Sequence, residues 1–218
     1  MQLRRLLAVV ALTIPAAARA QSRQPDLLDR AVTEWAKVKT ARATFEQDIV
    51  NPLTGSTMTS TGEYQQQRPG KLAVTFTSPA NDRIVADGKF VWVYLPSSAP
   101  AQVIKTAQGA AGSNTVDITA QFLTAPRSRY TVTSGGTLVV SGHPTHVYTL
   151  VPKSDDGATF KAASVWIDDD DATIRMFEAT DMNGVQRKVR LTSFKPNAPV
   201  DEAAFHFVPP AGVHVIAH

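Results

Sequence analysis

The sequence predicts one large, strongly curved antiparallel β-sheet accompanied by about two helical segments. From Ala43 onward, apolar and polar side chains alternate with the period of a β-strand over most of the chain. Turn signals rich in Gly, Asp, Asn and Pro separate these alternating stretches at short intervals, which is typical of an antiparallel meander. Residues 25–40 and 109–126 break that rhythm.

Both of these exceptional segments are expected to contain a helix. In residues 25–40, Leu28, Trp35 and Val38 lie on one helical stripe, and the charged side chains fall largely elsewhere. Asp26 favours a helix start, because a carboxylate near a helix N-terminus interacts favourably with the helix dipole. Such an amphipathic helix needs an apolar surface to lie against. The second, shorter helix would carry Val116, Ala120 and Leu123.

The strands are expected to be short and to be joined by tight turns. Asp87-Gly88 is a strong hairpin signal, and Gly135-Gly136 and Asn183-Gly184 are further turn signals. The aspartate run at 168–171 is expected to be a solvated hairpin turn. The expected strands cover residues 43–49, 58–66, 71–77, 83–86, 90–94, 103–106, 129–133, 137–141, 145–151, 160–167, 172–180 and 185–194.

The composition excludes several classes of protein. A length of 218 residues suggests one domain, or at most two small ones. Hydrophobic residues make up 43% of the chain and charged residues 19%, which favours a packed core over intrinsic disorder. Cysteine is absent, which excludes disulfide scaffolds, thiolate-ligated metal sites, thiol catalysis and lipid attachment at a cysteine.

The first twenty residues have the pattern of a cleaved secretory signal. Arg4 and Arg5 are followed by a short apolar run at 6–14 and by small residues at 18 and 20. We expect residues 21–218 to be the mature chain and to form a single domain. Cleavage removes three arginines and no acid, leaving 19 basic and 19 acidic residues. That balance argues against a nucleic-acid partner, since such binding needs clustered excess Lys and Arg.

No motif for catalysis or metal binding is evident. The five histidines form no helical metal-binding pair, and neither a Gly-x-Ser-x-Gly elbow nor a Gly-rich phosphate loop is found. Asp168–Asp171 resembles the start of a calcium loop, but Thr173 and Ala179 stand where that loop needs glycine and glutamate. We therefore assign no catalytic residue and no metal ligand, and we expect neither a cofactor nor an enzyme.

The inward faces carry more apolar side chain than a thin sheet usually needs. Residues 90–95 are apolar on both faces of their strand, and each face must be covered. Two interpretations are open, an ordinary filled core or a cavity for an apolar ligand. Alternation along the strands gives the cavity candidates, with Trp92 and Tyr94 preferred over Val91 and Val93 as the inward pair. With Leu28 and Trp35 contributed by the helix, the full set is Leu28, Trp35, Phe45, Leu72, Val74, Phe76, Trp92 and Tyr94.

The loop at 66–71 also has two interpretations. It is either an exposed basic turn, or it carries an arginine that reaches inward. Arg68 has five donors and a permanent charge, which suit it to hydrogen-bond the free carbonyl groups at a helix end.

Several segments resemble, in order and spacing, the periplasmic carriers of outer-membrane lipoproteins, the LolA family. The resemblance covers nearly the whole chain after the signal and includes the central signature of that family. The matching segments are ATFEQ at 43–47, RPGKL at 68–72, SP at 78–79, DGKFVWVY at 87–94, DMNG at 181–184 and FHFVPPAGV at 205–213.

This resemblance implies an incomplete antiparallel β-barrel of about eleven strands, covered by an α-helical lid with a hydrophobic cavity between them. It implies a monomeric periplasmic shuttle for acylated lipoproteins. An inner-membrane lipoprotein-releasing ABC transporter would supply the cargo, and an outer-membrane receptor lipoprotein would accept it. The lid-latching arginine of the family falls on Arg68, and the lid segment falls on Val116, Ala120 and Leu123.

Other functions remain as alternatives. The nearest is a periplasmic carrier of free lipid or glycolipid with the same fold. A secreted hydrolase acting on a lipid-like substrate would need a nucleophile, a base and an orienting partner, for which no motif is present. A structural or adhesion protein would have a filled core and would bind no lipid.

Overall fold

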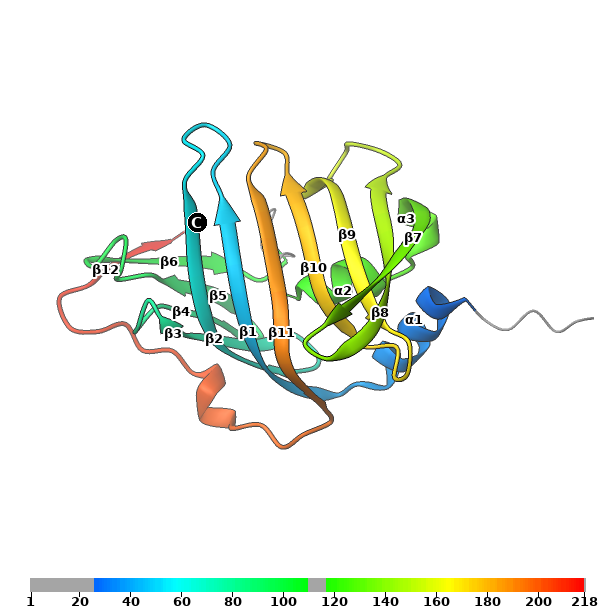
Figure 1. The fold of residues 1–218 in the computed structure, drawn as a ribbon. Helices are drawn as coiled ribbons and strands as arrows, with labels where there is room; N and C mark the ends of the chain where they lie inside the picture. The colour runs from blue at the N-terminus through cyan, green and yellow to red at the C-terminus, as the bar shows by residue number, and fades with distance from the viewer. Residues whose placement is uncertain (1–25, 110–116, 218) are drawn as a thin grey trace, which may run out of the picture.

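The computed structural model describes residues 26–109 and 117–217, and it is mainly β (Figure 1). Twelve strands in these ranges form one open, curved sheet in the order β12-β6-β5-β4-β3-β2-β1-β11-β10-β9-β8-β7. The strands are β1 (Thr40–Val50), β2 (Thr57–Gln67), β3 (Lys71–Ser78), β4 (Arg83–Asp87), β5 (Phe90–Tyr94), β6 (Gln102–Ala107), β7 (Tyr130–Val140), β8 (His143–Pro152), β9 (Phe160–Asp168), β10 (Ile174–Asp181), β11 (Gln186–Pro196) and β12 (His214–Ala217).

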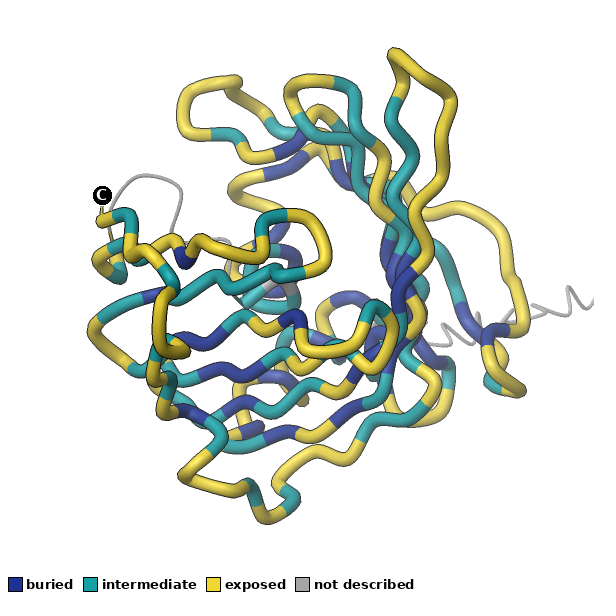
Figure 2. The backbone as a smooth tube through the Cα atoms, turned by 90° about the vertical axis from the view of Figure 1, so that its left-hand side faces the viewer, coloured by how far each residue is buried: buried dark blue, intermediate teal, exposed yellow. Residues whose placement is uncertain are grey.

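This architecture confirms the predicted fold class of a curved, incomplete barrel, with one strand more than the resemblance implied. Neighbouring strands are antiparallel throughout, except that β12 runs parallel to β6. Figure 2 shows the bend of the sheet, with exposed residues gathered mainly in the turns.

The helices cover the concave side of one half of the sheet. They are α1 (Leu27–Lys37), α2 (Ile118–Leu123) and α3 (Pro126–Arg129). In Figure 1, α2 lies behind β9 and β10, and α1 lies close to the lower end of β8. α1 is shorter than the predicted helix at 25–40 because Thr40 already begins β1. A 3-10 helix, η2 (Glu202–Phe205), instead contacts β3 and β4.

The Gly135-Gly136 pair is not the turn that the sequence predicted. It lies inside β7, where the register with β8 shifts between Ser134 and Thr137. A Cβ atom at Gly135 would come within 2.5 Å of the Val147 side chain, so the bulge needs a residue without a side chain. The two short strands expected at 129–133 and 137–141 are therefore one bulged strand.

The prediction that Trp92 and Tyr94 face the cavity is wrong. Strand register pairs Leu72 with Ala86 and Ala86 with Val91, so these three residues share one face. Trp92 and Tyr94 therefore lie on the opposite, convex face, and Val91 and Val93 point inward.

The convex aromatic residues have a cover of their own. The ring of Phe207, which follows η2, lies 5.8 Å from the ring of Trp92 and 5.9 Å from that of Tyr94. The Trp92 indole N–H also donates a hydrogen bond of 2.9 Å to Asp87. The segment after β11 thus partly covers aromatic surface that a bare sheet would expose, which is one reason why residues 90–95 are apolar on both faces.

This convex contact should contribute to stability. Trp92→Ala removes the ring contacts with Phe207 and the bond to Asp87, and we expect it to lower the free energy of unfolding by about 2–4 kcal/mol. Urea unfolding followed by circular dichroism measures the change. Leu53→Ala is the control, because Leu53 is 92% exposed in a turn and its truncation should cost less than about 0.5 kcal/mol. Equal effects of the two substitutions would contradict the assignment.

Candidate functional site

Most of the predicted cavity residues meet on the concave face. Leu28 and Trp35 of α1 join Phe45 of β1 in the main buried cluster, and Val74 and Phe76 of β3 pack against that cluster. The rings of Phe45 and Phe76 meet edge to face, with their centroids 5.6 Å apart. The structure therefore brings these five side chains together between α1 and the sheet.

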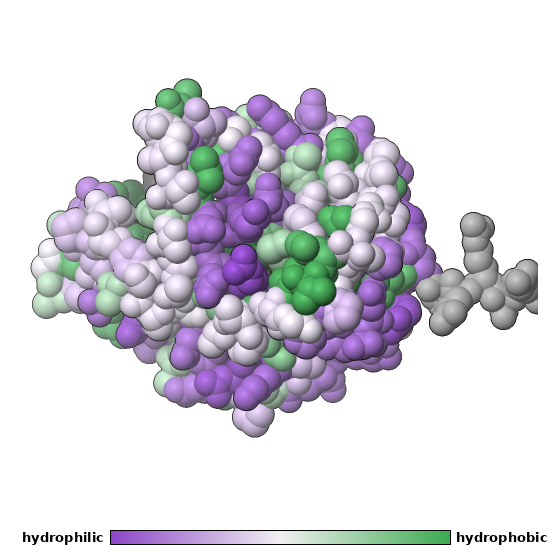
Figure 3. All heavy atoms as spheres, in the orientation of Figure 1, coloured by the Kyte–Doolittle hydropathy of each residue, from purple (hydrophilic) through white to green (hydrophobic). Residues whose placement is uncertain are grey.

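Leu72 belongs to a second, smaller cluster. It is buried with Ala86 and Val91, and Val74 contacts both this cluster and the main one. The apolar lining therefore continues along β3, β4 and β5, beyond the part of the sheet that the helices cover. Figure 3 shows the opposite face, which is mainly hydrophilic or neutral with separated apolar spots.

A cavity of about 300 Å³ lies between α1 and the ends of β10 and β11. Trp35 is the predicted cavity residue that lines it, and Leu123 from the predicted lid segment also contributes. The apolar sheet residues on its wall are Ile174, Leu191 and Phe194. Polar side chains, among them Glu34, Lys37 and Asn197, complete its wall, so this space is only partly apolar.

Of the predicted lid residues, two fall within the described part of the chain. Leu123 is buried and Ala120 is partly buried in α2, whereas Val116 lies outside the described residues. The sequence analysis missed Phe122, which is 1% exposed and is the main apolar anchor of α2. Its ring lies 5.7 Å from that of Phe160 and 5.3 Å from that of Phe177.

Arg68 meets the end of α1. Its Nη1 donates a hydrogen bond of 3.0 Å to the carbonyl oxygen of Trp35, and its guanidinium lies 4.3 Å from the centre of the Trp35 ring. The same carbonyl oxygen also accepts a bond of 3.1 Å from the Val38 amide at the helix C-cap, and the carbonyl groups at a helix end carry partial negative charge, so a cation is favourable there. Stacking on the indole adds a cation–π contact. The side chain therefore reaches inward, in line with the second interpretation of its loop.

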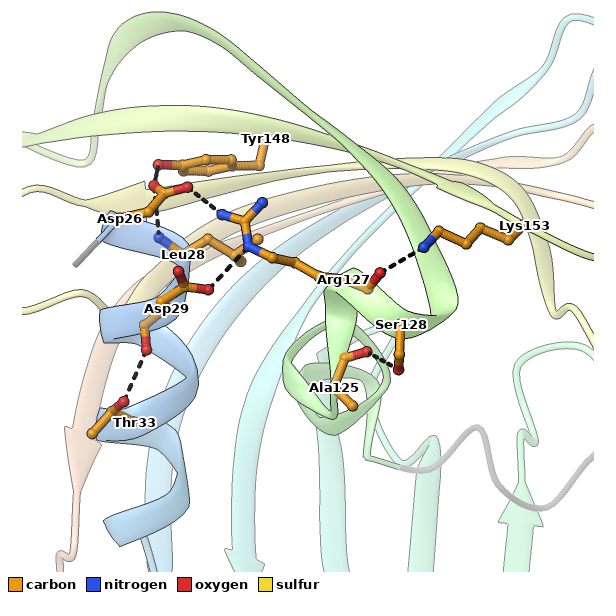
Figure 4. Close-up of polar contacts among 9 residues, drawn as sticks. All are labelled: Asp26, Leu28, Asp29, Thr33, Ala125, Arg127, Ser128, Tyr148 and Lys153. Atoms are coloured by element: carbon orange, nitrogen blue, oxygen red, sulfur yellow. Dashed lines mark hydrogen bonds and ion pairs between the residues drawn. The ribbon is translucent and has the colours of Figure 1, made fainter. Parts of the chain in front are cut away.

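The beginning of α1 is held by a different set of contacts, which we call the Asp26 clasp (Figure 4). Asp26 caps the helix by accepting a hydrogen bond from the Leu28 amide. It also accepts a bond of 2.5 Å from the Tyr148 hydroxyl of β8. Arg127 of α3 pairs with Asp26 and lies 3.1 Å from Asp29. The clasp joins α1 to α3 and to the sheet.

These contacts shift the ionisation of the clasp. Burial acts to raise the pKa of Asp26, but the bonds from Tyr148 and Leu28 and the Arg127 guanidinium outweigh it, so the pKa lies below its ordinary value. Burial, the hydrogen bond to Asp26 and the negative charge of Asp26 raise the pKa of Tyr148 to about 12. At neutral pH the carboxylate is therefore charged and the phenol is protonated, as the clasp needs.

The aspartate run at 168–171 forms the turn between β9 and β10, as predicted, but its first residue is not solvated. Asp168 is fully buried and accepts a hydrogen bond of 2.8 Å from Arg175. His143 lies 2.8 Å from the same carboxylate oxygen. Among the residues that the structure describes, no group of three His, Asp or Glu side chains could hold a metal ion. Asp168 therefore has a structural role in the turn.

The family model described as outer membrane lipoprotein carrier protein LolA matches residues 36–208. The chain belongs to the LolA family. Within the described ranges, no helix is both long enough and apolar enough to span a membrane.

Individual proteins agree with the family match. The chain is 31% identical over 180 residues to the outer-membrane lipoprotein carrier protein of Chromobacterium violaceum, covering 82% of each chain. It is 29% identical over 177 residues to that of Sodalis glossinidius, covering 81% of each. An uncharacterised conserved protein of Thermus thermophilus has the same fold, with a TM-score of 0.55 at 16% identity, over 88% of this chain and 97% of its own.

The Asp26 clasp predicts a defined response to acid. Because the folded-state pKa of Asp26 is lowered, its stabilising contribution is complete above the ordinary carboxyl pKa of about 4 and is lost as the pH falls through the folded-state value. Asp26→Asn should therefore lower stability at about pH 7 and have a smaller effect at about pH 3. Urea unfolding of both proteins at the two pH values measures this. A stability difference that does not shrink on acidification would contradict the prediction.

Proposed function

We propose that this protein is a carrier and chaperone that binds the acyl chains of lipoproteins and moves them across the periplasm. It receives them from an inner-membrane lipoprotein-releasing ABC transporter and delivers them to an outer-membrane receptor lipoprotein. It acts as a monomer, without catalysis, after export and removal of residues 1–20. The observation that supports this most directly is a small helical cover held by polar contacts over an apolar concave face, in a chain of the LolA family.

The physical need for such a carrier is large. Exposing an acyl chain to water costs roughly 0.8 kcal/mol per methylene, so a sixteen-carbon chain costs on the order of 12 kcal/mol. Lipoproteins with two or three chains would rarely cross an aqueous space unaided. The concave face offers apolar side chains from both the sheet and α1, which can replace water around those chains.

A carrier must also release its cargo. In this structure Leu28, Trp35 and Phe122 already occupy much of the concave face. An acyl chain must therefore displace α1 or α2, and the helices compete with it for the same surface. This competition lowers the net affinity by the free energy of closure, which allows transfer to a receptor that binds the chains more tightly.

Arg68 would supply part of that closure energy. Arg68→Leu removes the charged side-chain donor to the Trp35 carbonyl, so we expect the variant to load cargo but to release it about tenfold more slowly or worse, as the loss of a hydrogen bond from a charged donor implies. Transfer of bound lipoprotein to receptor-containing vesicles measures this. A variant that transfers cargo at the parent rate would rule out the latch.

Phe76 tests the apolar concave face as the binding surface. Phe76→Glu places a carboxylate on the concave face, where burial disfavours it, and acyl binding should be lost while the protein stays folded. Thr75→Glu is the matched control, because Thr75 is the exposed neighbour on the other face of β3. We would measure release of labelled lipoproteins from spheroplasts by the purified mature protein, with circular dichroism to verify folding.

The outcomes of this release experiment separate the candidate functions. A soluble one-to-one complex formed by the parent and by Thr75→Glu, but not by Phe76→Glu, would support the lipoprotein carrier. No release, with phospholipid or glycolipid co-purifying instead, would favour the carrier of free lipid. Neither release nor bound lipid would contradict the concave face as a lipid-binding surface.

A further inference from the structure

Three alternate residues at the end of β2 and just beyond it point toward α1 and α2, which together we call the lid. Tyr64 pairs with Val74, and Gln66 pairs with Leu72, which places both on the concave face. Arg68 follows two residues later and reaches α1. The apolar lining is thus interrupted by a polar stripe formed by Tyr64, Gln66 and Arg68.

Gln66 contacts the other helix of the lid. Its side-chain amide donates a hydrogen bond to the carboxylate of Asp117. Asp117 is the N-cap of α2, and its other carboxylate oxygen accepts a bond of 2.9 Å from the Ala120 amide. The sheet is therefore linked through one side chain to the first turn of α2.

The orientation of this amide follows from its neighbours. The Tyr64 hydroxyl donates to Gln66 Oε1 at 2.5 Å, so the nitrogen of the amide must face Asp117. Burial foremost, and also the nearby charge of Asp117, raise the pKa of Tyr64 well above its ordinary value, so the phenol keeps its proton and remains a donor. Gln66 is 4% exposed, so water cannot easily replace these bonds while the lid is closed.

We propose that Gln66 is a second latch of the lid, a positioning residue that holds α2 through Asp117 as Arg68 holds the end of α1. This inference rests on the proposed carrier function and assigns a separate contact to each lid helix. Lifting α2 breaks a buried, charge-assisted bond, whereas lifting α1 breaks the bond from Arg68. The two helices can then open by separate steps, and both are held by residues at the end of β2 or just after it.

Hydrogen exchange on the purified protein without cargo tests the latch. Gln66→Leu should speed exchange of the α2 amides of Ala120, Gln121 and Thr124 about tenfold, as expected for loss of a hydrogen bond to a charged group. The amides of α1 should keep the parent rates. Gln65→Leu is the matched control, because Gln65 lies on the other face of β2 and bonds to Asp201 instead of the lid.

A rescue experiment separates a latch from general loosening. Gln66→Glu faces Asp117 with a second carboxylate and should open α2 further than Gln66→Leu. The double variant Q66E/D117N restores a donor–acceptor pair and keeps a good N-cap, so slow exchange of α2 should return. Equal acceleration of α1 and α2, exchange in Gln66→Leu no faster than in Gln65→Leu, or absence of rescue would each overturn the proposal.

The same variants connect the latch to cargo handling. In the transfer assay, Gln66→Leu should load lipoprotein and release it more slowly than the parent, as expected for Arg68→Leu. Normal transfer, in a preparation that Phe76→Glu shows to depend on the concave face, would overturn the role of Gln66 in release. Failure of the parent protein to carry lipoprotein would instead count against the carrier function, since the exchange results do not depend on cargo.

Discussion

The structure depends on one constraint: a single open sheet that is apolar on its concave side must have that side covered. A closed barrel would fill its interior with its own strands, and a sandwich would use a second sheet. Here short helices provide the cover for the half between β7 and β11, and Leu28 and Phe122 are their deepest contacts. Because the cover is small and local, removing it leaves the hydrogen-bonded ladder of the sheet intact.

The contacts that retain the cover differ in strength. The ion pairs of Arg127 at the start of α1 are partly exposed, and pairs of that kind contribute little in water. Gln66 is buried, and the Arg68 contact is partly buried, stacked on an indole. The restraints at the end of β2 are therefore better shielded from water than the Arg127 pairs, and the start of α1 is retained mainly by the Asp26 cap and the bond from Tyr148.

The sequence predicted the strands well where one face was polar and the other apolar. Alternation placed Phe45, Val74 and Phe76 correctly, because a half-buried strand carries that information in its pattern. It failed at Trp92 and Tyr94, since residues 90–95 are apolar on both sides and the period has no contrast. Phe207, whose ring covers Trp92 on the convex face, lies more than a hundred positions away in the sequence.

The parts of the site that the sequence did not predict also depend on contacts between segments that are far apart in the chain. Gln66 and Asp117 are ordinary polar residues in the sequence, and only the packing of α2 against β2 gives them a joint role. Arg127 likewise acquires its partners from α1. The matching segments of the LolA family pointed to Arg68, but they gave no information on contacts that this chain forms between distant segments.

The parallel pairing of β12 with β6 has a consequence for the order of assembly. Val215 lies beside Val103, so the edge of the sheet at β6 is completed by a segment that leaves the ribosome more than a hundred positions later. The aromatic surface of Trp92 on the convex face is likewise covered only once Phe207 has been synthesised. Until residues 207–217 are present, the chain has an open strand edge at β6 and an uncovered aromatic surface, two features that favour association of incomplete chains.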